Sequence, residues 1–409
     1  MKKSTTRARG LQSIVILGLI VVLLATACTP ATSSGEPQKV VEFGNITPLT
    51  GPASASEQLG FWGMEDYVRY FNEIEGIPGV TIEHSWIDTG FVVPNAISAY
   101  RKFIDRDVLC LISDHTEALP GIVSELEKDQ VPMVTGLQSE YLIYPPGWVY
   151  GQSPTYAETF TALADYIMEN WQEQRPPRLA FMGSDTEFTW SPVSEGTKYA
   201  ESIGMEILPT EVVPHVPLDT TGQLLRLKER GADFVYIQMI PVVAVPILRD
   251  AERLGLIDKI HFTGAESSAG DILIEALGPA SDGYLFPKVV PYWDETELLG
   301  IQLMIDNQMK YYGKEVSNRE TPYILVWVTA AIICEAIKRA IEDVGYENID
   351  GIAVKKVLDD MKGYDVYDLV TIGYTPEDHR GSNKVAVYQI QDGKIVRVTD
   401  WKEAPMLVP

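Results

Sequence analysis

The side chains best suited to acid–base chemistry stand together at Asp378, His379 and Arg380. A carboxylate beside a histidine is a pairing that general acid–base catalysis uses. Gly381 and a predicted hairpin follow at once, so the sequence favours a polar turn over a catalytic group. The five histidines are scattered at positions 84, 115, 215, 261 and 379. None has a second His or Cys at metal-ligand spacing, which argues against a zinc site.

The common phosphate-binding and nucleophile motifs are absent from the sequence. It contains no Gly-x-Gly-x-x-Gly and no Gly-x-Ser-x-Gly, and Gly313-Lys314 lacks the flanking residues of a P-loop. The net charge of −24 argues against nucleic acid or an anionic membrane surface as a partner. We therefore expect no enzymatic activity, no cofactor and no metal.

The stretch over residues 40–74 indicates how the chain positions its polar groups. An apolar strand is predicted at 40–46, a polar loop at 47–53 and a helix after it. Ser54 and Glu57 have the spacing of a capping box, so we expect the helix to begin there. In an open α/β sheet, ligands bind at such a loop, beyond the carboxyl end of the strand.

The same alternation of strand and helix continues to residue 135 and, after a break rich in proline and aromatic residues at 141–154, starts again. It predicts an α/β fold with two Rossmann-like lobes, each built on a parallel sheet with helices on both faces. Three helices without intervening strands are predicted at 295–312, 323–344 and 352–362. Asp392-Gly393 then predicts a late hairpin. This order implies that the chain crosses between the lobes three times and leaves a cleft between them.

The N-terminus carries a targeting signal. Basic residues precede an apolar run at 14–24 that is too short to span a bilayer comfortably. Ala25-Thr26-Ala27-Cys28 follows and resembles a bacterial lipoprotein signal, in which Cys28 is lipidated, although ordinary cleavage after Ala27 also fits. We expect residues 1–27 to be a signal peptide and 28–39 a flexible tether. Cys110 and Cys334 lie in apolar runs, and their spacing does not indicate a disulfide.

Four stretches together resemble a known family, the type I periplasmic substrate-binding proteins of ABC importers, in the branched-chain amino acid (Leu/Ile/Val) group. They are Pro48-Leu49-Thr50-Gly51-Pro52, V-P-M-V-T-G-L-Q-S at 131–139, Thr263-Gly264-Ala265-Glu266, and G-Y-T-P-E-D-H-R-G at 373–381 with its following hairpin. The resemblance spans about residues 40–401. It implies a periplasmic binding protein type I fold, with residues 40–152 and 288–369 in lobe 1 and residues 153–287 and 370–405 in lobe 2.

The resemblance also implies ligand contacts in the first lobe. In amino-acid binders, hydroxyls and backbone N–H groups of two loops hold the ligand carboxylate, and the matching positions here are His115, Thr116, Leu137 and Ser139. The usual serine-rich loop reads Asp114-His115-Thr116-Glu117 in this chain. Two carboxylates beside a ligand carboxylate would repel it, which disfavours a standard α-amino acid. Ser56 stands where the first loop often offers an aromatic ring, which leaves room for a bulkier ligand.

In the second lobe, Glu266 matches the carboxylate that receives the ligand ammonium, and such a contact is strong once water is excluded. On this interpretation, Glu266→Gln weakens a ligand that carries an ammonium more than one that does not. Phe188 and Trp190 are candidates for the aromatic residue that packs on the ligand. Each of these residues has an alternative role in ordinary packing or at the surface.

The leading hypothesis is an extracytoplasmic solute-binding protein of an ABC importer, which binds a small amino-acid-like or amide-like solute in the cleft. The partners are then the solute and the ABC permease subunits, with the chain a monomer held to the membrane through lipidated Cys28. The alternative is a ligand-sensing receptor domain that acts with a separate signalling partner. A secreted enzyme built around Asp378, His379 and Glu266 is the third hypothesis.

Overall fold

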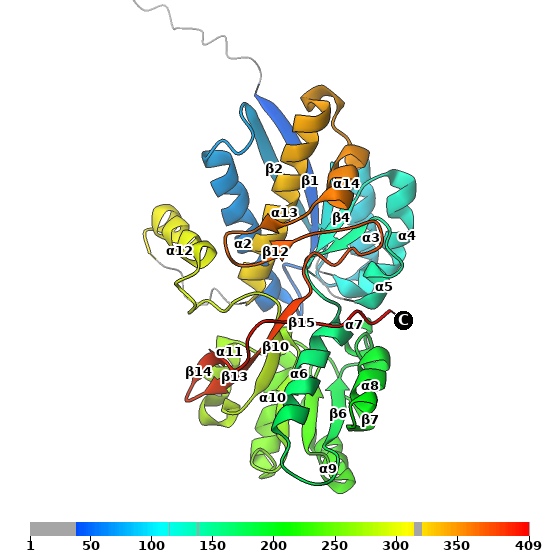
Figure 1. The fold of residues 1–409 in the computed structure, drawn as a ribbon, viewed down its shortest axis with the longest axis vertical. Coiled ribbons are helices and arrows are strands. Elements are labelled where there is room, and N and C mark those ends of the chain that lie inside the picture. Colours follow the sequence, from blue (N-terminus) through cyan, green and yellow to red (C-terminus); the bar gives the residue numbers. More distant parts are fainter. Residues whose placement is uncertain (1–37, 114, 137–138, 315–320, 409) are drawn as a thin grey trace, which may run out of the picture. The chain divides into compact units, whose positions relative to one another are not determined.

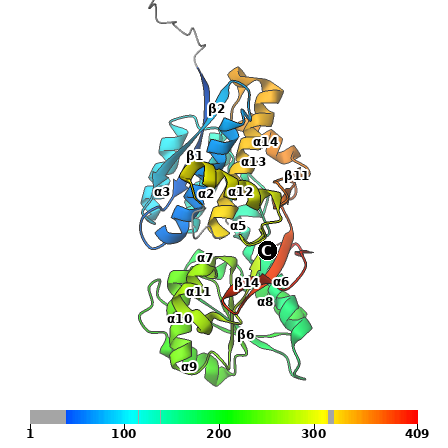
Figure 2. The same ribbon diagram turned by 90° about the vertical axis from the view of Figure 1, so that its left-hand side faces the viewer.

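A computed structural model describes residues 38–113, 115–136, 139–314 and 321–408. From Lys39 onward the chain forms one compact unit, Lys39–Pro409. The expected signal peptide, Cys28 and most of the expected tether lie outside the described residues, and so does Leu137. The described part of the unit Lys39–Pro409 contains two large β-sheets with their helices and a separate two-stranded sheet (Figures 1 and 2).

The first sheet has five parallel strands in the order β2-β1-β3-β4-β5. These strands are β1 (Lys39–Thr47), β2 (Val80–Asp88), β3 (Leu111–Ser113), β4 (Met133–Thr135) and β5 (Val149–Gly151). Strands β3, β4 and β5 and most of β1 are buried, as expected of a parallel sheet between two layers of helices, whereas the edge strand β2 is partly exposed. We call this sheet and the helices packed on it the first lobe.

Helices cover both faces of the first sheet. The helices are α2 (Ser54–Glu73), α3 (Val93–Ile104), α4 (Pro120–Asp129), α5 (Glu140–Ile143), α12 (Leu299–Tyr312), α13 (Thr321–Val344) and α14 (Gly351–Asp360). One core cluster joins the sheet to α2, α13 and α14, and a second joins it to α3 and α4. A small hairpin of β11 (Tyr364–Asp365) and β12 (Thr371–Ile372) closes over the first cluster.

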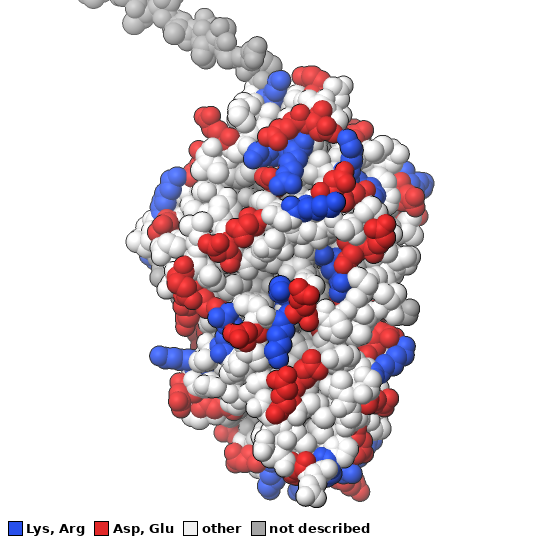
Figure 3. Space-filling model, in the orientation of Figure 1, with Lys and Arg blue, Asp and Glu red and all other residues white. Residues whose placement is uncertain are grey.

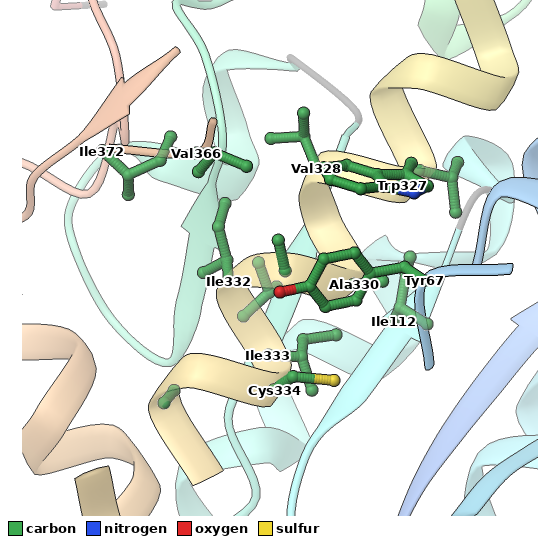
Figure 4. Close-up of a cluster of buried hydrophobic side chains, with 14 of the residues drawn as sticks. Tyr67, Ile112, Trp327, Val328, Ala330, Ile332, Ile333, Cys334, Val366 and Ile372 are labelled. Carbon is green, nitrogen blue, oxygen red and sulfur yellow. The ribbon is translucent and has the colours of Figure 1, made fainter. Parts of the chain in front are cut away.

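The centre of the first core is α13, which is apolar around most of its circumference and therefore buried (Figure 4). Its Trp327 packs edge-on against Tyr67 of α2, with ring centroids 4.6 Å apart. Helices α2 and α13 approach so closely that a Cβ on Gly63 would lie 2.2 Å from the carbonyl oxygen of Tyr323. Cys110 and Cys334 are both buried in this core as free thiols.

The second lobe repeats the winding of the first. Its parallel strands follow the order β7-β6-β8-β9-β10, and the antiparallel pair β13-β14 extends the sheet beyond β10, with β15 paired to β13. The strands are β6 (Arg178–Gly183), β7 (Glu206–Val212), β8 (Phe234–Ile237), β9 (His261–Gly264), β10 (Leu285–Lys288), β13 (Lys384–Gln391), β14 (Lys394–Arg397) and β15 (Lys402–Glu403). The predicted hairpin is thus confirmed, with Asp392 and Gly393 both at positive φ.

The helices of the second lobe also lie on two faces. They are α6 (Tyr156–Asn170), α7 (Glu187–Trp190), α8 (Val193–Ser202), α9 (Thr221–Arg230), α10 (Pro241–Arg253) and α11 (Asp271–Leu277). Side chains of α9, α10 and α11 share one core cluster with the sheet, and side chains of α6 and α8 share another. The predicted α/β fold with two doubly wound lobes is therefore confirmed.

Three segments connect the sheets: the one from β5 to α6, the one from β10 toward α12, and the one from β12 to β13. The first and third are joined directly, because Gly381 N–H donates to the Gly151 carbonyl at 2.7 Å and Gly151 N–H donates to the His379 carbonyl at 2.9 Å. Ile372 and Tyr374 belong to the core cluster around α13. The packing of the first lobe thus extends past residue 369, where we had placed its boundary.

The expected capping box at the start of α2 is wrong. The helix does begin at Ser54, but its N-cap is Ala53, whose backbone is already helical and which makes no side-chain cap bond. Ser54 therefore lies inside the first turn, where its hydroxyl cannot act as the cap. A true capping box stands at the start of α6, where Thr155 accepts from Glu158 N–H and Glu158 accepts from Thr155 N–H.

Acidic and basic side chains are interspersed on the face of the molecule in Figure 3. Ion pairs at helical spacing join an exposed basic side chain to a mostly buried carboxylate, as in Lys198 with Glu195 and Arg253 with Asp250. Within the described ranges, no helix combines the length and the apolar character needed to cross a bilayer.

Candidate ligand-binding cleft

A cavity of about 160 Å³ lies at the carboxyl ends of the strands, with walls from both lobes. In each lobe it adjoins the two loops at which the strand order reverses. These loops follow β1 and β3 in the first lobe, and β6 and β8 in the second. The loop after β9 and the first turns of α13 complete the walls. Open α/β sheets bind ligands at such reversal points, because the loops diverge there and leave a crevice.

The cavity wall is mainly apolar. Its aromatic and aliphatic side chains include Phe91, Tyr156, Phe188, Val243 and Leu325. Three glutamates and one histidine also line it: Glu57, Glu117, Glu266 and His215. Among the described lining residues there is no Lys or Arg. Burial raises the pKa of the Glu117 carboxyl. The site therefore favours an apolar solute, and no described lining residue is a Lys or Arg that could pair with a carboxylate.

Four of the residues expected to contact ligand line this cavity, namely Ser56, Thr116, Phe188 and Glu266. Phe188 packs edge-on against Tyr156, with ring centroids 5.0 Å apart, so the two rings form one aromatic corner of the wall. Ser56 lies in the first turn of α2, and Thr116 begins the short helical turn after β3. At these positions each residue can contact a solute in the cavity. The ligand contacts themselves stay a prediction.

The other expected residues that the structure describes do not line the cavity. His115 is fully buried behind the wall, where its ring stacks on Phe91 at 4.8 Å and its Nδ1 lies 3.2 Å from the Thr89 hydroxyl. Burial lowers the pKa of His115 to about 4, so the ring is neutral near pH 7. Ser139 is buried at the start of α5. Trp190 is 40% exposed and donates its indole N–H to Asp185.

The Glu266 carboxylate is buried at the end of the loop that follows β9, with only 8% of the residue exposed. Its Oε1 accepts a hydrogen bond from Lys288 Nζ at 3.1 Å. Its Oε2 is buried without a hydrogen-bond partner. Burial raises the pKa of Glu266, and the nearby Lys288 ammonium and the Val289 N–H act in the opposite direction.

Lys288 is a functional candidate that the sequence analysis missed. It ends β10 and its side chain is completely buried, with Nζ donating to Thr321 Oγ1 of the first lobe at 2.5 Å as well as to Glu266. The rings of Tyr292 and Tyr388 lie 5.7 and 5.9 Å from Nζ. The sequence did contain a signal for this residue. A lysine ends the apolar strand Leu285–Lys288 and is followed by two valines.

The cluster Asp378-His379-Arg380 lies in the third connecting segment, outside the cavity lining. Arg380 forms a two-pronged pair with Asp378, at 2.9 and 2.8 Å, and lies 3.2 Å from Glu158 of α6. His379 donates its Nδ1–H to the Val149 carbonyl at 2.9 Å and stacks on Tyr150, with ring centroids 4.1 Å apart. The expected polar turn is thus a buried junction between the lobes. In the part of the chain that the structure describes, no group of His, Cys, Asp and Glu side chains could hold a metal ion.

Comparisons with known proteins agree with this architecture. A family described as "Periplasmic binding protein" matches residues 40–394, and the chain belongs to that family. A branched chain amino acid ABC transporter protein from Thermus thermophilus with bound valine is 25% identical, with a TM-score of 0.80 over 90% of this chain and 97% of the other.

Two further solved structures share the fold at lower identity. A substrate-binding ABC transporter protein from Aeropyrum pernix is 19% identical, with a TM-score of 0.81 over 90% of this chain and 97% of the other. A fatty acid ABC transporter substrate-binding protein from Thermomonospora curvata is 17% identical, with a TM-score of 0.79 over 92% of this chain and 96% of the other. The search of curated proteins gave no match.

Proposed function

We propose that this chain is an extracytoplasmic solute-binding protein of an ABC importer, which binds one small solute in the cleft and delivers it to a membrane permease. The observation that carries the proposal is the cavity itself, whose walls come from the strand-end loops of both lobes. A solute held by both walls stabilises the closed arrangement, because it contacts the two lobes at once. Membership in the periplasmic binding protein family and the likeness to ABC substrate-binding proteins support the role.

The cavity also limits the solute. A volume of about 160 Å³ suits a molecule of amino-acid size, and the apolar lining suits an aliphatic or aromatic body. Ser56, Thr116, Phe188 and Glu266 are the proposed contacts. The solute class is therefore small and amino-acid-like or amide-like.

A thermal-shift screen of amino acids, amides, urea and aromatic acids tests the binding role. A solute present at one hundred times its dissociation constant adds about 2.7 kcal/mol of apparent stability. We expect at least one member of the screen to raise the melting temperature, and calorimetry to give one site per chain. A screen with no stabilising solute would count against the proposal.

A matched pair of variants locates the site. Leu325→Trp adds an indole to the cavity wall, whereas Leu225→Trp makes the same change on the exposed face of α9. We expect the first variant to lose binding and the second to bind like the parent. Equal binding by both variants would place the solute outside the cleft.

The membrane anchor is a separate part of the proposal. We place the signal peptide at residues 1–27, the lipid on Cys28 and the tether at 28–39. Mass spectrometry of the mature N-terminal peptide from the membrane fraction would show diacylglycerol on Cys28, and Cys28→Ser would release the protein. An unmodified N-terminus at Cys28 would contradict the lipid anchor and would leave the binding role intact.

A further inference from the structure

The charge of Glu266 is balanced from within the protein. Lys288 Nζ approaches Oε1 at 3.1 Å, and the lysine side chain has no exposed surface. Thr321 Oγ1 accepts a second hydrogen bond from the same ammonium at 2.5 Å. Two tyrosine rings lie within 6 Å of Nζ, a range in which ring faces attract a cation. Lys288 is therefore fixed in place by groups on three sides and cannot leave the pair without losing all of them.

This arrangement disfavours an ammonium group on the solute. A ligand ammonium at Glu266 would lie close to the Lys288 ammonium in a water-excluded site, where like charges repel strongly. The same carboxylate would then have to balance two cations. Lys288 thus occupies, on Oε1, the place that we had assigned to a ligand ammonium.

A carboxylate on the solute is disfavoured as well. The described lining contains Glu57, Glu117 and Glu266, and it contains neither Lys nor Arg. Glu117 loses water on burial, and its pKa is raised for that reason. A ligand carboxylate in this cavity would be desolvated beside acidic groups, and no Lys or Arg among the described lining residues could compensate.

One strong acceptor in the wall remains unused. Glu266 Oε2 is buried without a hydrogen-bond partner, and the adjacent Ser267 hydroxyl also lines the cavity without one. A buried acceptor left unpaired is costly, and an ionised one gains most from a donor. An uncharged N–H or O–H donor can satisfy Oε2 without repelling Lys288, and the rest of the wall is apolar.

From these contacts we propose that the solute is electrically neutral, with an aliphatic or aromatic body and an amide N–H or hydroxyl group that donates to Glu266 Oε2. The inference rests on the proposed binding role and names its substrate class. Lys288 acts as the specificity-determining residue, since it rejects solutes that carry an ammonium.

Two matched sets of compounds test this class by calorimetry on the full mature chain. Leucine, isovalerate, isoamylamine and isovaleramide share an isobutyl body, and phenylalanine, phenylacetate, phenethylamine and phenylacetamide share a benzyl body. Within each set only the charged groups differ. We expect the neutral amide of at least one set to bind at least tenfold tighter than its zwitterion, anion and cation.

The outcomes separate the two proposals. A zwitterion, anion or cation that binds as tightly as its matched amide overturns the neutral-solute class and leaves the binding role standing. Absence of binding by all eight compounds at millimolar concentration overturns the neutral-solute class, and it overturns the binding role as well only if the thermal-shift screen also finds no stabilising solute.

A charge-removing variant tests the role of Lys288. In Lys288→Met, Glu266 lacks its internal cation, and we expect isoamylamine and phenethylamine to bind at least tenfold tighter than they bind the parent. Lys128→Met is the matched control, because Lys128 pairs with Glu125 on the exposed surface of α4, and it should bind like the parent. Unchanged amine binding in folded Lys288→Met would overturn the role of Lys288. If Lys288→Met does not fold, Lys288→Gln keeps a polar group beside Thr321 and is judged by the same measurement.

Discussion

Two buried carboxylates of this protein each face a buried cation, yet their surroundings differ. Glu158 lies at the junction of the lobes, where its oxygens accept from Tyr144, from Thr155 N–H and from Leu407 N–H, with Arg380 3.2 Å away. Glu266 lies in the cleft, accepts one hydrogen bond from Lys288, and leaves Oε2 unpaired. Both oxygens of Glu158 accept hydrogen bonds from within the protein, as a structural junction requires. At the second site, Glu266 Oε2 still lacks a hydrogen-bond donor.

The difference matters because both carboxylates are desolvated to nearly the same extent, at 0% and 8% exposure. Burial of a charge is tolerated when the charge is paired and its remaining oxygens are hydrogen-bonded. Glu158 meets both conditions and Glu266 meets only the first. The unpaired Oε2 in a cavity with walls from both lobes supports the proposal that Glu266 contacts the solute.

The largest expected effect is on the free energy of unfolding of Glu158→Gln. Breaking a buried ion pair costs about 3–5 kcal/mol, and the several further hydrogen bonds to Glu158 put this variant near the upper end. Glu266→Gln loses fewer contacts and should cost about 3 kcal/mol. Urea unfolding of both variants measures the difference. A cost for Glu266→Gln as large as that for Glu158→Gln would remove the distinction between the two sites.

The next effect is the pH dependence of stability in Lys288→Met. Without the lysine, a buried and uncompensated Glu266 should lower the free energy of unfolding by about 3 kcal/mol at pH 8. Burial holds the pKa of Glu266 above its usual value, and loss of Lys288 raises it further. A carboxyl whose folded pKa is raised loses stability as pH rises through that pKa, so the deficit should shrink between pH 8 and pH 5.

The matched measurement is urea unfolding of parent and variant at both pH values. The double variant Lys288→Met with Glu266→Gln removes the buried carboxyl, so it should lack the loss of stability that the single variant shows between pH 5 and pH 8. A pH-independent deficit in the single variant would mean that Glu266 is not the group responsible.

The smallest effect is on affinity and compares two aromatic residues in one short helix. Phe188 faces the cavity beside Tyr156, whereas Trp190 is exposed and bonded to Asp185. Phe188→Ala should weaken binding of an aromatic solute about tenfold, which corresponds to about 1.4 kcal/mol. Trp190→Ala should leave the dissociation constant unchanged in the same calorimetric titration. If both variants lost affinity equally, the solute would have to lie nearer to Trp190 than a position in the cavity allows.

Much of the fold could be predicted from the sequence because its cause is local. The alternation of strand and helix, and the Asp392-Gly393 turn, depend on residues close in the chain. The capping box at Ser54 was wrong because the backbone of Ala53 had already become helical, which the side-chain spacing does not reveal. The sequence predicted only a polar turn at Asp378-His379-Arg380, because the residues that this segment contacts, Glu158 and Val149, lie far away in sequence.

The sequence by itself determined two α/β lobes, a late hairpin and a carboxylate after β9, because periodicity and turn chemistry are properties of neighbouring residues. Only the tertiary structure decided which charges meet. Lys288 reaches Glu266 and Thr321 across separations of 22 and 33 residues, and no local pattern encodes such a contact. The resemblance to amino-acid binders led us to expect a ligand ammonium at Glu266. The structure puts the protein's own ammonium there and leaves one oxygen open, because the end of β10 brings Lys288 beside the loop that follows β9.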